Sequence, residues 1–224
     1  MHSRPIVITA MKKSLLPLCL IVAIALGSVV LLSWTGGSYA ADTQRAPLEE
    51  PQDIPEGAQI AYFAGGCFWC TEEIFQQVPG VIPVTSGYMG GSEPSPTYDQ
   101  VSDGTTGHAE SVRVVFDPTK TSYEKLLTAF WKAHDPTQLN RQGPDKGRQY
   151  RSAIFTSNAR QQEAAEKSKA ELAKSGVYSK PIVTEIAKAG KFYPAEEYHQ
   201  NFYRKHPDHP YVRQWLVPKL KISE

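Results

Sequence analysis

The segment around Gly65-Gly66 constrains the fold more than any other part of the chain. Before it, residues 60–64 form a short apolar run, which indicates a buried strand. After it, residues 71–78 have the apolar spacing of a helix that ends at Pro79-Gly80. The sequence therefore predicts a strand, a glycine turn and a helix in direct succession, with Cys67 at or just before the helix N-terminus.

The rest of the pattern mixes short strands with helices. Residues 83–107 are rich in Gly, Pro, Ser and Thr and are expected to be a long ordered loop, and the polar residues 134–149 are expected to be another loop. The other expected elements are strands at 110–116, 153–156 and 182–187, a helix behind a capping box at Thr121–Glu124, a helix of about 16 residues from Ser157 or Asn158 to Gly176, and a short helix from Ala195 to Lys205. This mixture predicts a single α+β domain.

The first 40 residues are set apart from that domain. A head with three basic residues precedes an apolar run at 15–32, and small residues follow up to Ala40-Ala41. This is the layout of a secretory signal peptide. The apolar run also reaches about 18 residues, which is close to the length of a membrane span. We therefore expect residues 1–40 to be a cleaved signal peptide or a membrane anchor, and either places the domain in the periplasm or outside the cell.

The folded part is expected to begin near Gln59. Residues 41–58 are rich in proline and acidic residues and predict a flexible linker, which leaves 59–224 as the folded domain. After position 40 there remain 21 Lys and Arg against 23 Asp and Glu, a net charge of −2. A nearly neutral surface gives no reason to expect a nucleic-acid partner.

The cysteines favour redox chemistry over a structural disulfide. Of the three, Cys19 lies in the N-terminal segment, and Cys67 and Cys70 are spaced C-x-x-C. A disulfide between them closes so short a loop that it stabilises little. A helix N-terminus also stabilises a thiolate, so the pKa of Cys67 is expected to be lowered.

A series of sequence blocks resembles the peptide methionine sulfoxide reductase A family. The blocks run in that family's order over about residues 60–205 and are specific when taken together. They are Gly66-Cys67-Phe68-Trp69 with Glu72 or Glu73, Pro79-Gly80-Val81, Ser86-Gly87-Tyr88-Met89-Gly90-Gly91, Pro96-Thr97-Tyr98, Gly107-His108-Ala109-Glu110, His134-Asp135-Pro136-Thr137, Leu139-Asn140-Arg141-Gln142-Gly143, Asp145, Gln149-Tyr150-Arg151-Ser152, Phe192-Tyr193-Pro194-Ala195-Glu196 and Tyr198-His199-Gln200.

The resemblance implies both a fold and a reaction. The fold would be a two-layer α/β sandwich around a mixed, ferredoxin-like sheet. The reaction would be reduction of methionine S-sulfoxide, free or in oxidised proteins, through a sulfenic acid on Cys67. The implied roles are an acid at Glu110, hydroxyl donors at Tyr98 and Tyr150, a substrate-holding carboxylate at Asp145, and a pocket for the S-methyl group at Phe68 and Trp69.

The position of Glu110 supports its implied role independently. Glu110 shares strand parity with Val112, Val114 and Phe116, so its side chain should point to the apolar face. A carboxyl group there loses its hydration, which raises its pKa and makes it an acid near neutral pH.

Cys70 is expected to be the resolving cysteine. Many family members carry a resolving cysteine in a C-terminal tail, and this sequence has no cysteine after Cys70. Condensation of a sulfenic acid with a thiol gives a disulfide, here Cys67–Cys70, expected to be exposed to an external thioredoxin-like dithiol. No bound cofactor is expected, and the protein is expected to be a monomer.

Two other hypotheses use the same cysteines. One is a thiol–disulfide oxidoreductase built on the C-x-x-C pair. The other is a metal-binding module with Cys67, Cys70, His206 and His209 as ligands. The sites predicted from the resemblance include no metal, and the oxidoreductase hypothesis leaves Glu110, Tyr98 and Tyr150 without a task.

Overall fold

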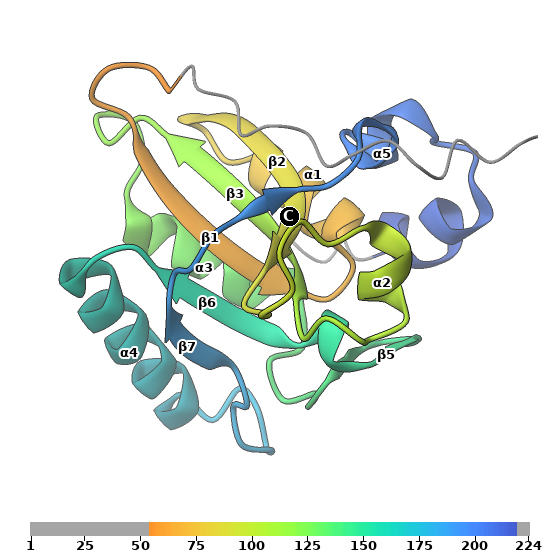
Figure 1. Ribbon diagram of the computed structural model, residues 1–224. Helices are drawn as coiled ribbons and strands as arrows, with labels where there is room; N and C mark the ends of the chain where they lie inside the picture. Colours follow the sequence, from red (N-terminus) through yellow and green to blue (C-terminus); the bar gives the residue numbers. More distant parts are fainter. Residues whose placement is uncertain (1–53, 219–224) are drawn as a thin grey trace, which may run out of the picture. The chain divides into compact units, whose positions relative to one another are not determined.

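A six-stranded mixed sheet in the order β7-β6-β1-β3-β2-β8 forms the centre of the protein (Figure 1). The structure, a computed structural model, describes residues 54–218. The strands of this sheet are β1 (Gln59–Gly65), β2 (Val81–Met89), β3 (Ala109–Phe116), β6 (Ser152–Thr156), β7 (Glu185–Lys188) and β8 (Tyr193–Pro194).

The connections between the four central strands give the ferredoxin-like arrangement that was expected. β1 is antiparallel to both β3 and β6, and β2 is antiparallel to β3. The chain passes from β1 to β2 through α1 (Phe68–Gln76) and from β3 to β6 through α3 (Tyr123–Ala133), so each crossover skips one strand. The parallel pair β6–β7 makes the sheet mixed. The predicted α+β class and single-domain, two-layer architecture are confirmed.

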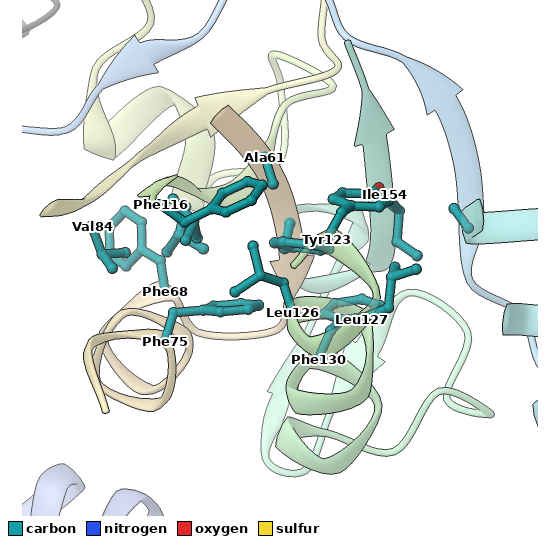
Figure 2. Close-up of a cluster of buried hydrophobic side chains, with 14 of the residues drawn as sticks. Ala61, Phe68, Phe75, Val84, Phe116, Tyr123, Leu126, Leu127, Phe130 and Ile154 are labelled. Atoms are coloured by element: carbon teal, nitrogen blue, oxygen red, sulfur yellow. The ribbon is translucent and has the colours of Figure 1, made fainter. Parts of the chain in front are cut away.

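The main core lies between the sheet and the two crossover helices. Figure 2 shows Phe68 and Phe75 of α1 and Phe130 of α3 in the layer that faces the strands. The ring of Phe63, on β1, stacks on Phe75 at 4.7 Å and on Phe130 at 5.2 Å between centroids. α4 (Ala159–Lys174) then packs beside α3, with Asn158 as its N-cap as expected.

The opposite face of the sheet is also covered. Phe192, just before β8, packs with Ala64, Met89 and Phe155 in a second buried cluster. This explains why every residue of β3 is buried, although its side chains alternate between the two faces.

The region 83–107 is not the continuous loop that its composition predicts. β2 continues to Met89, and a short helix α2 (Tyr98–Ser102) follows. Gly87 contributed to the wrong prediction, because glycine usually marks a turn. In the structure Gly87 lies within a strand, where an added Cβ would come within 2.4 Å of the Phe192 ring and of the Tyr193 carbonyl oxygen. The close approach of β8 therefore requires glycine at this position.

Three other expected elements differ from the structure. Ser122 rather than Thr121 caps α3, by accepting a hydrogen bond from the backbone N–H of Lys125. The expected helix from Ala195 to Lys205 is two short pieces, η2 (Glu197–His199) and α5 (Phe202–Lys205), because Asn201 adopts a left-handed conformation with φ of 56°. The expected strand at 182–187 is β7, which starts at Glu185 and ends at Lys188.

The polar stretch 134–149 contains a small hairpin. Its strands are β4 (Arg141–Gln142) and β5 (Asp145–Lys146), and the helical turn η1 (Arg148–Tyr150) follows. Within residues 54–218, no helix has the length and apolar character needed to cross a membrane. The predicted signal peptide or anchor at 1–40, and the predicted linker as far as residue 53, lie outside the described residues.

Candidate active site

Cys67 lies in the turn between β1 and α1, as the sequence predicts. It is the N-cap residue of α1, and its carbonyl oxygen accepts hydrogen bonds from the N–H groups of Cys70 and Thr71. Gly66 precedes it with φ of +93°, and an added Cβ would lie 2.5 Å from the Cβ of Gln142. The glycine thus permits both the turn and the close approach of the β4–β5 hairpin.

The sheet register brings Glu110 to the same turn. Phe63 pairs with Val112, and continuing this register by two residues places Glu110 level with Gly65. The Glu110 Oε2 atom accepts a hydrogen bond of 2.9 Å from the backbone N–H of Phe68. The side chain lies on the same face of β3 as Val112 and Val114, as its strand parity predicts, and is 2 % exposed.

The environment of Glu110 makes it a proton donor near neutral pH. Its pKa is raised to about 8, chiefly by burial and also by the nearby Asp145 carboxyl group, although the hydrogen bond from Phe68 opposes the shift. A carboxyl group with such a pKa is mostly protonated at pH 7.

Seven of the eight predicted site residues line one cavity of about 250 Å³. Two residues that were not predicted as part of the enzyme site, His209 and Tyr211, complete its wall. The predicted residues in the wall are Cys67, Phe68, Trp69, Tyr98, Glu110, Asp145 and Tyr150. These come from the turn before α1 and from α1, α2, β3, β5 and η1.

The two predicted hydroxyl donors reach the cavity from separate local structures. Tyr98 is the first residue of α2, and Tyr150 is the last residue of η1. Burial is the main cause that raises the pKa of each phenol above its ordinary value, and the nearby Glu110 carboxyl group adds to it. Both phenols therefore keep their hydrogens and are able to donate them.

The expected lowering of the Cys67 pKa is contradicted. Burial raises the pKa of this thiol well above its ordinary value, and Glu110 and Asp145 raise it further, while a hydrogen bond with Tyr211 opposes the change. The first N–H group of the helix, that of Phe68, donates to Glu110 and not to the thiol. A thiolate here would lie in a buried site beside two carboxyl groups.

Cys70 lies outside the cavity wall. It is in the first turn of α1 and packs against Ile74, Ala133 and two residues of η3 (Val212–Leu216). Both cysteines are present as thiols, with Cys67 6 % exposed and Cys70 3 % exposed. Both side chains are therefore buried in the reduced form, whereas the expected exposure concerns the disulfide and stays a prediction.

Trp69 is held from two sides by residues near the end of the chain. Its indole N–H donates a hydrogen bond of 3.1 Å to Nδ1 of His199. Its ring stacks on Phe202 with centroids 3.7 Å apart and an angle of 8° between the planes. Burial lowers the pKa of His199 to about 4, so the imidazole is neutral and accepts this bond. The block Tyr198-His199-Gln200 marked His199 as part of the resemblance but did not reveal this contact.

Tyr211 is the clearest residue that sequence reasoning missed. Its hydroxyl donates a hydrogen bond of 2.5 Å to Oδ2 of Asp145 and also lies near the Cys67 sulfur. Tyr211 lies beyond the blocks that carry the family resemblance, and no local pattern marks it. Asp145 is thus held at the cavity wall by a residue 66 positions later in the chain.

The histidines proposed as metal ligands have other surroundings. His206 packs on the ring of Phe202, and His209 lines the cavity and lies edge-on to Trp69. In the part of the chain that the structure describes, no three His, Cys, Asp or Glu side chains are grouped to hold a metal ion.

A larger cavity of about 690 Å³ lies at the start of β1, between the first residues of α3 and α4. None of the predicted site residues lines it. Its volume exceeds that of the cavity at Cys67. We nevertheless place the candidate active site at the smaller cavity, because only that cavity is lined by both the Cys67 thiol and the Glu110 carboxyl group with its raised pKa.

Comparisons with known proteins agree with the geometry. The family profile described as "Peptide methionine sulfoxide reductase" matches residues 59–223. The chain is similar to the protein named peptide methionine sulfoxide reductase MsrA of Methanosarcina acetivorans, with 53 % identity over 173 residues that cover 75 % of this chain and 92 % of that protein.

Two solved structures have the same fold. Methionine sulfoxide reductase A of Corynebacterium diphtheriae is 39 % identical with a TM-score of 0.61, over 68 % of this chain and 77 % of that one. The reduced form of Mxr1 from Saccharomyces cerevisiae is 34 % identical with a TM-score of 0.65, over 69 % and 89 % of the two chains. The extent of the family match, together with these relatives, shows that the chain belongs to the peptide methionine sulfoxide reductase family.

Proposed function

We propose that the chain reduces methionine S-sulfoxide, in peptides and as the free amino acid, with Cys67 as the nucleophile and Glu110 as the acid. Family membership supports the reaction, and one observation carries the assignment of roles. A buried thiol, a carboxyl group with a pKa of about 8 and two phenol donors, Tyr98 and Tyr150, line one cavity of about 250 Å³.

Binding would place the substrate's sulfoxide oxygen toward the donors and its methyl group toward the aromatic wall. Phe68 and Trp69 supply the apolar surface of the cavity. Tyr98 and Tyr150 donate hydrogen bonds to the oxygen, which gains negative charge as the reaction proceeds. Asp145, fixed by Tyr211, holds the polar part of the substrate on the other side.

The first step transfers the oxygen from the substrate to Cys67. The Cys67 sulfur attacks the sulfoxide sulfur while Glu110 gives its proton to the oxygen, and Glu110 recovers a proton from the thiol. The hydroxyl group then moves from the substrate sulfur to the Cys67 sulfur as the bond between the two sulfurs and the sulfur–oxygen bond of the substrate break, so methionine leaves and Cys67 becomes a sulfenic acid. Methionine sulfur gains two electrons and cysteine sulfur loses two, so the step is balanced without another reactant.

The second step regenerates the thiols. The Cys70 thiol attacks the Cys67 sulfenic acid, which gives a Cys67–Cys70 disulfide and water. Because η3 covers Cys70, its residues Val212 and Leu216 must shift before an outside reductant reaches the disulfide. A thioredoxin-like dithiol would then reduce the disulfide by exchange and become oxidised itself.

The proposal extends to the place of action. The basic, apolar and small-residue succession in residues 1–40 supports export, followed by either cleavage or anchoring in a membrane. The protein would then act in the periplasm or outside the cell, as a monomer that repairs oxidised methionine in exported proteins. Its reductant would be a thioredoxin-like protein of the same compartment.

The test is a comparison of the two epimers of N-acetyl-methionine sulfoxide as substrates. The purified protein is mixed with each epimer and dithiothreitol, and methionine derivative formation is followed. Reduction of the S epimer alone, abolished in Cys67→Ser, is the expected result. Reduction of neither epimer by folded, reduced protein would contradict the proposal and favour the thiol–disulfide oxidoreductase hypothesis.

A further inference from the structure

The carboxyl group of Glu196 joins two tyrosines on different parts of the chain. Its Oε1 atom accepts a hydrogen bond of 2.9 Å from the backbone N–H of Tyr98. Its Oε2 atom accepts one of 2.8 Å from the hydroxyl of Tyr88. Glu196 lies between β8 and η2 and is 5 % exposed, so the carboxyl group is buried with both oxygens engaged.

Both partners of Glu196 adjoin the proposed reaction. Tyr98 lines the cavity, and Tyr88 is the cross-strand partner of Glu110 in the β2–β3 pair. The Tyr88 ring is buried and lies 5.9 Å from the ring of Phe68, between centroids. The position of Glu196 is therefore linked to the hydroxyl donor on one side and to the neighbour of the acid on the other.

Tyr98 lies on the connection between β2 and β3, which is also held by the fully buried Val101 of α2 and by the Tyr98 ring, 4.4 Å from the ring of His199 between centroids. At the base of this connection, His108 accepts from the Gly91 N–H at 3.1 Å, and its other ring nitrogen lies 2.8 Å from the Glu93 carbonyl oxygen. At the far end of α2, the side chain of Gln149 donates to the carbonyl oxygen of Ser102. The contact between Glu196 and the Tyr98 backbone lies between these points, at the catalytically relevant residue.

We propose that Glu196 is a positioning residue for the reductase step, which fixes the Tyr98 hydroxyl at the sulfoxide oxygen. The inference rests on the role of Tyr98 in the proposed function. Glu196 acts through the Tyr98 backbone and lies outside the cavity wall. Substitution of Glu196 should therefore change the rate of oxygen transfer and not the affinity for substrate.

The chemistry of the two hydrogen bonds predicts which substitutions are tolerated. Glu196→Gln retains a carbonyl oxygen for the Tyr98 N–H, and its amide group donates to Tyr88, whose hydroxyl switches to an acceptor. Glu196→Asp is one methylene shorter and reaches one partner at a time. Glu196→Ala reaches neither.

The experiment is a double-mutant cycle on the full chain, read as the single-turnover rate of methionine formation at saturating S-sulfoxide. Glu196→Ala is expected to lower this rate by about 10²-fold, and Glu196→Asp by about 10-fold, through misplacement of Tyr98. Glu196→Gln is expected to stay within about 3-fold of the unsubstituted protein. In a Tyr98→Phe background, the Ala and Asp substitutions should each cost less than about 3-fold further, because the hydroxyl they displace is already missing.

Tyr88→Phe is the matched control, because it removes the other partner of the same carboxyl group and leaves Tyr98 bound. It is expected to lower the rate much less than Glu196→Ala. Circular dichroism and thermal unfolding check that each variant folds. If Glu196→Ala does not fold, Glu196→Asp is used in its place in the double-mutant cycle.

The outcomes separate this inference from the proposed function. Equal losses in both backgrounds, or a Glu196→Ala rate equal to that of the unsubstituted protein, would overturn the positioning role alone. An unchanged rate in Tyr98→Phe would remove Tyr98 from the proposed function, and with it the residue on which Glu196 acts. A large loss in Glu196→Gln without loss in Glu196→Asp would show that charge, not the placement of Tyr98, is what matters.

Discussion

The backbone N–H of Phe68 donates its hydrogen bond to Glu110, 42 residues later in the chain, and not to the thiol of Cys67 next to it. The first donor of helix α1 thus holds the Glu110 carboxyl group. The same contact lowers the pKa of Glu110 only partly, so the carboxyl group retains a pKa of about 8 and stays protonated at neutral pH. The proposed nucleophile, Cys67, and the proposed acid, Glu110, both carry their protons before substrate binds.

Cys67 is therefore expected to react slowly with alkylating reagents at neutral pH. Its pKa is raised by burial and by the carboxyl groups of Glu110 and Asp145. The rate at which iodoacetamide modifies Cys67 is followed by mass spectrometry in the Cys70→Ser variant. This rate should still increase with pH at values where an ordinary cysteine thiol is already fully ionised and its rate is constant. Asp145→Asn should shift this profile to lower pH. A modification rate that becomes constant below pH 8 in Cys70→Ser without the Asp145 substitution would contradict the expectation.

Glu110→Gln is expected to slow the first step by about 10²- to 10⁴-fold, because the amide has no proton to give to the departing oxygen. The measurement is single-turnover formation of methionine at pH 7. Glu72→Gln is a matched control, since Glu72 is also buried with a pKa raised by burial, to about 7, but does not line the cavity. An equal loss in both variants would point to damage of the fold instead of loss of the acid.

Local patterns were sufficient to predict the centre of the site. The β1–glycine–α1 turn depends on neighbouring residues, and the direction of Glu110 depends on strand parity, so both were visible in the sequence. Gly87 was misread because its packing against Phe192 is a contact across the sheet. Tertiary contacts of that kind leave no mark on local composition.

The supporting contacts could not be predicted for the same reason. The bond between Trp69 and His199 joins residues 130 positions apart, and the bond between Tyr211 and Asp145 joins residues 66 apart. The pKa of Cys67 was expected to fall from helix position alone, but burial and two carboxyl groups brought in by folding reverse the sign. Helix geometry is local, whereas the charges around a residue depend on the whole fold.

Trp69→Ala is expected to raise the KM for methionine sulfoxide by about 10-fold or more, through loss of an apolar wall worth roughly 1.5–3 kcal/mol. The value of kcat should fall less than KM rises. Trp131→Phe is the control, since Trp131 is a buried tryptophan that donates to Ser168 at 2.8 Å and lies outside the cavity. A KM that changes equally in the two variants would argue against a substrate contact at Trp69.

Cys70→Ser is expected to separate the two halves of the reaction. One equivalent of methionine should form in the absence of reductant, with Cys67 left as a sulfenic acid that dimedone traps. Turnover with thioredoxin as reductant should be lost, because no thiol remains beside Cys67 to form the disulfide. Full thioredoxin-driven turnover in this variant would remove Cys70 from the resolving role.

The raised pKa of Glu110 also predicts how stability depends on pH. The carboxyl group has an ordinary pKa of 4.5 and a folded-state pKa of about 8, so between these values the unfolded chain releases a proton that the folded protein keeps. Stability contributed by this group is therefore lost as pH rises, at about 1.4 kcal/mol per pH unit. The loss begins near pH 4.5 and is complete above pH 8.

Glu110→Gln has no such titration. The difference in the free energy of unfolding between Glu110→Gln and the unsubstituted protein should therefore grow in favour of the variant as pH rises from 5 to 8. Denaturant unfolding at several pH values under reducing conditions measures it, and Glu72 titrates equally in both proteins and cancels. If the two stability profiles are parallel across this range, Glu110 is not the buried, protonated acid on which the mechanism depends. A difference in the free energy of unfolding that increases with pH would show that the protonated Glu110 carboxyl group beside Cys67 makes the folded protein less stable as pH rises.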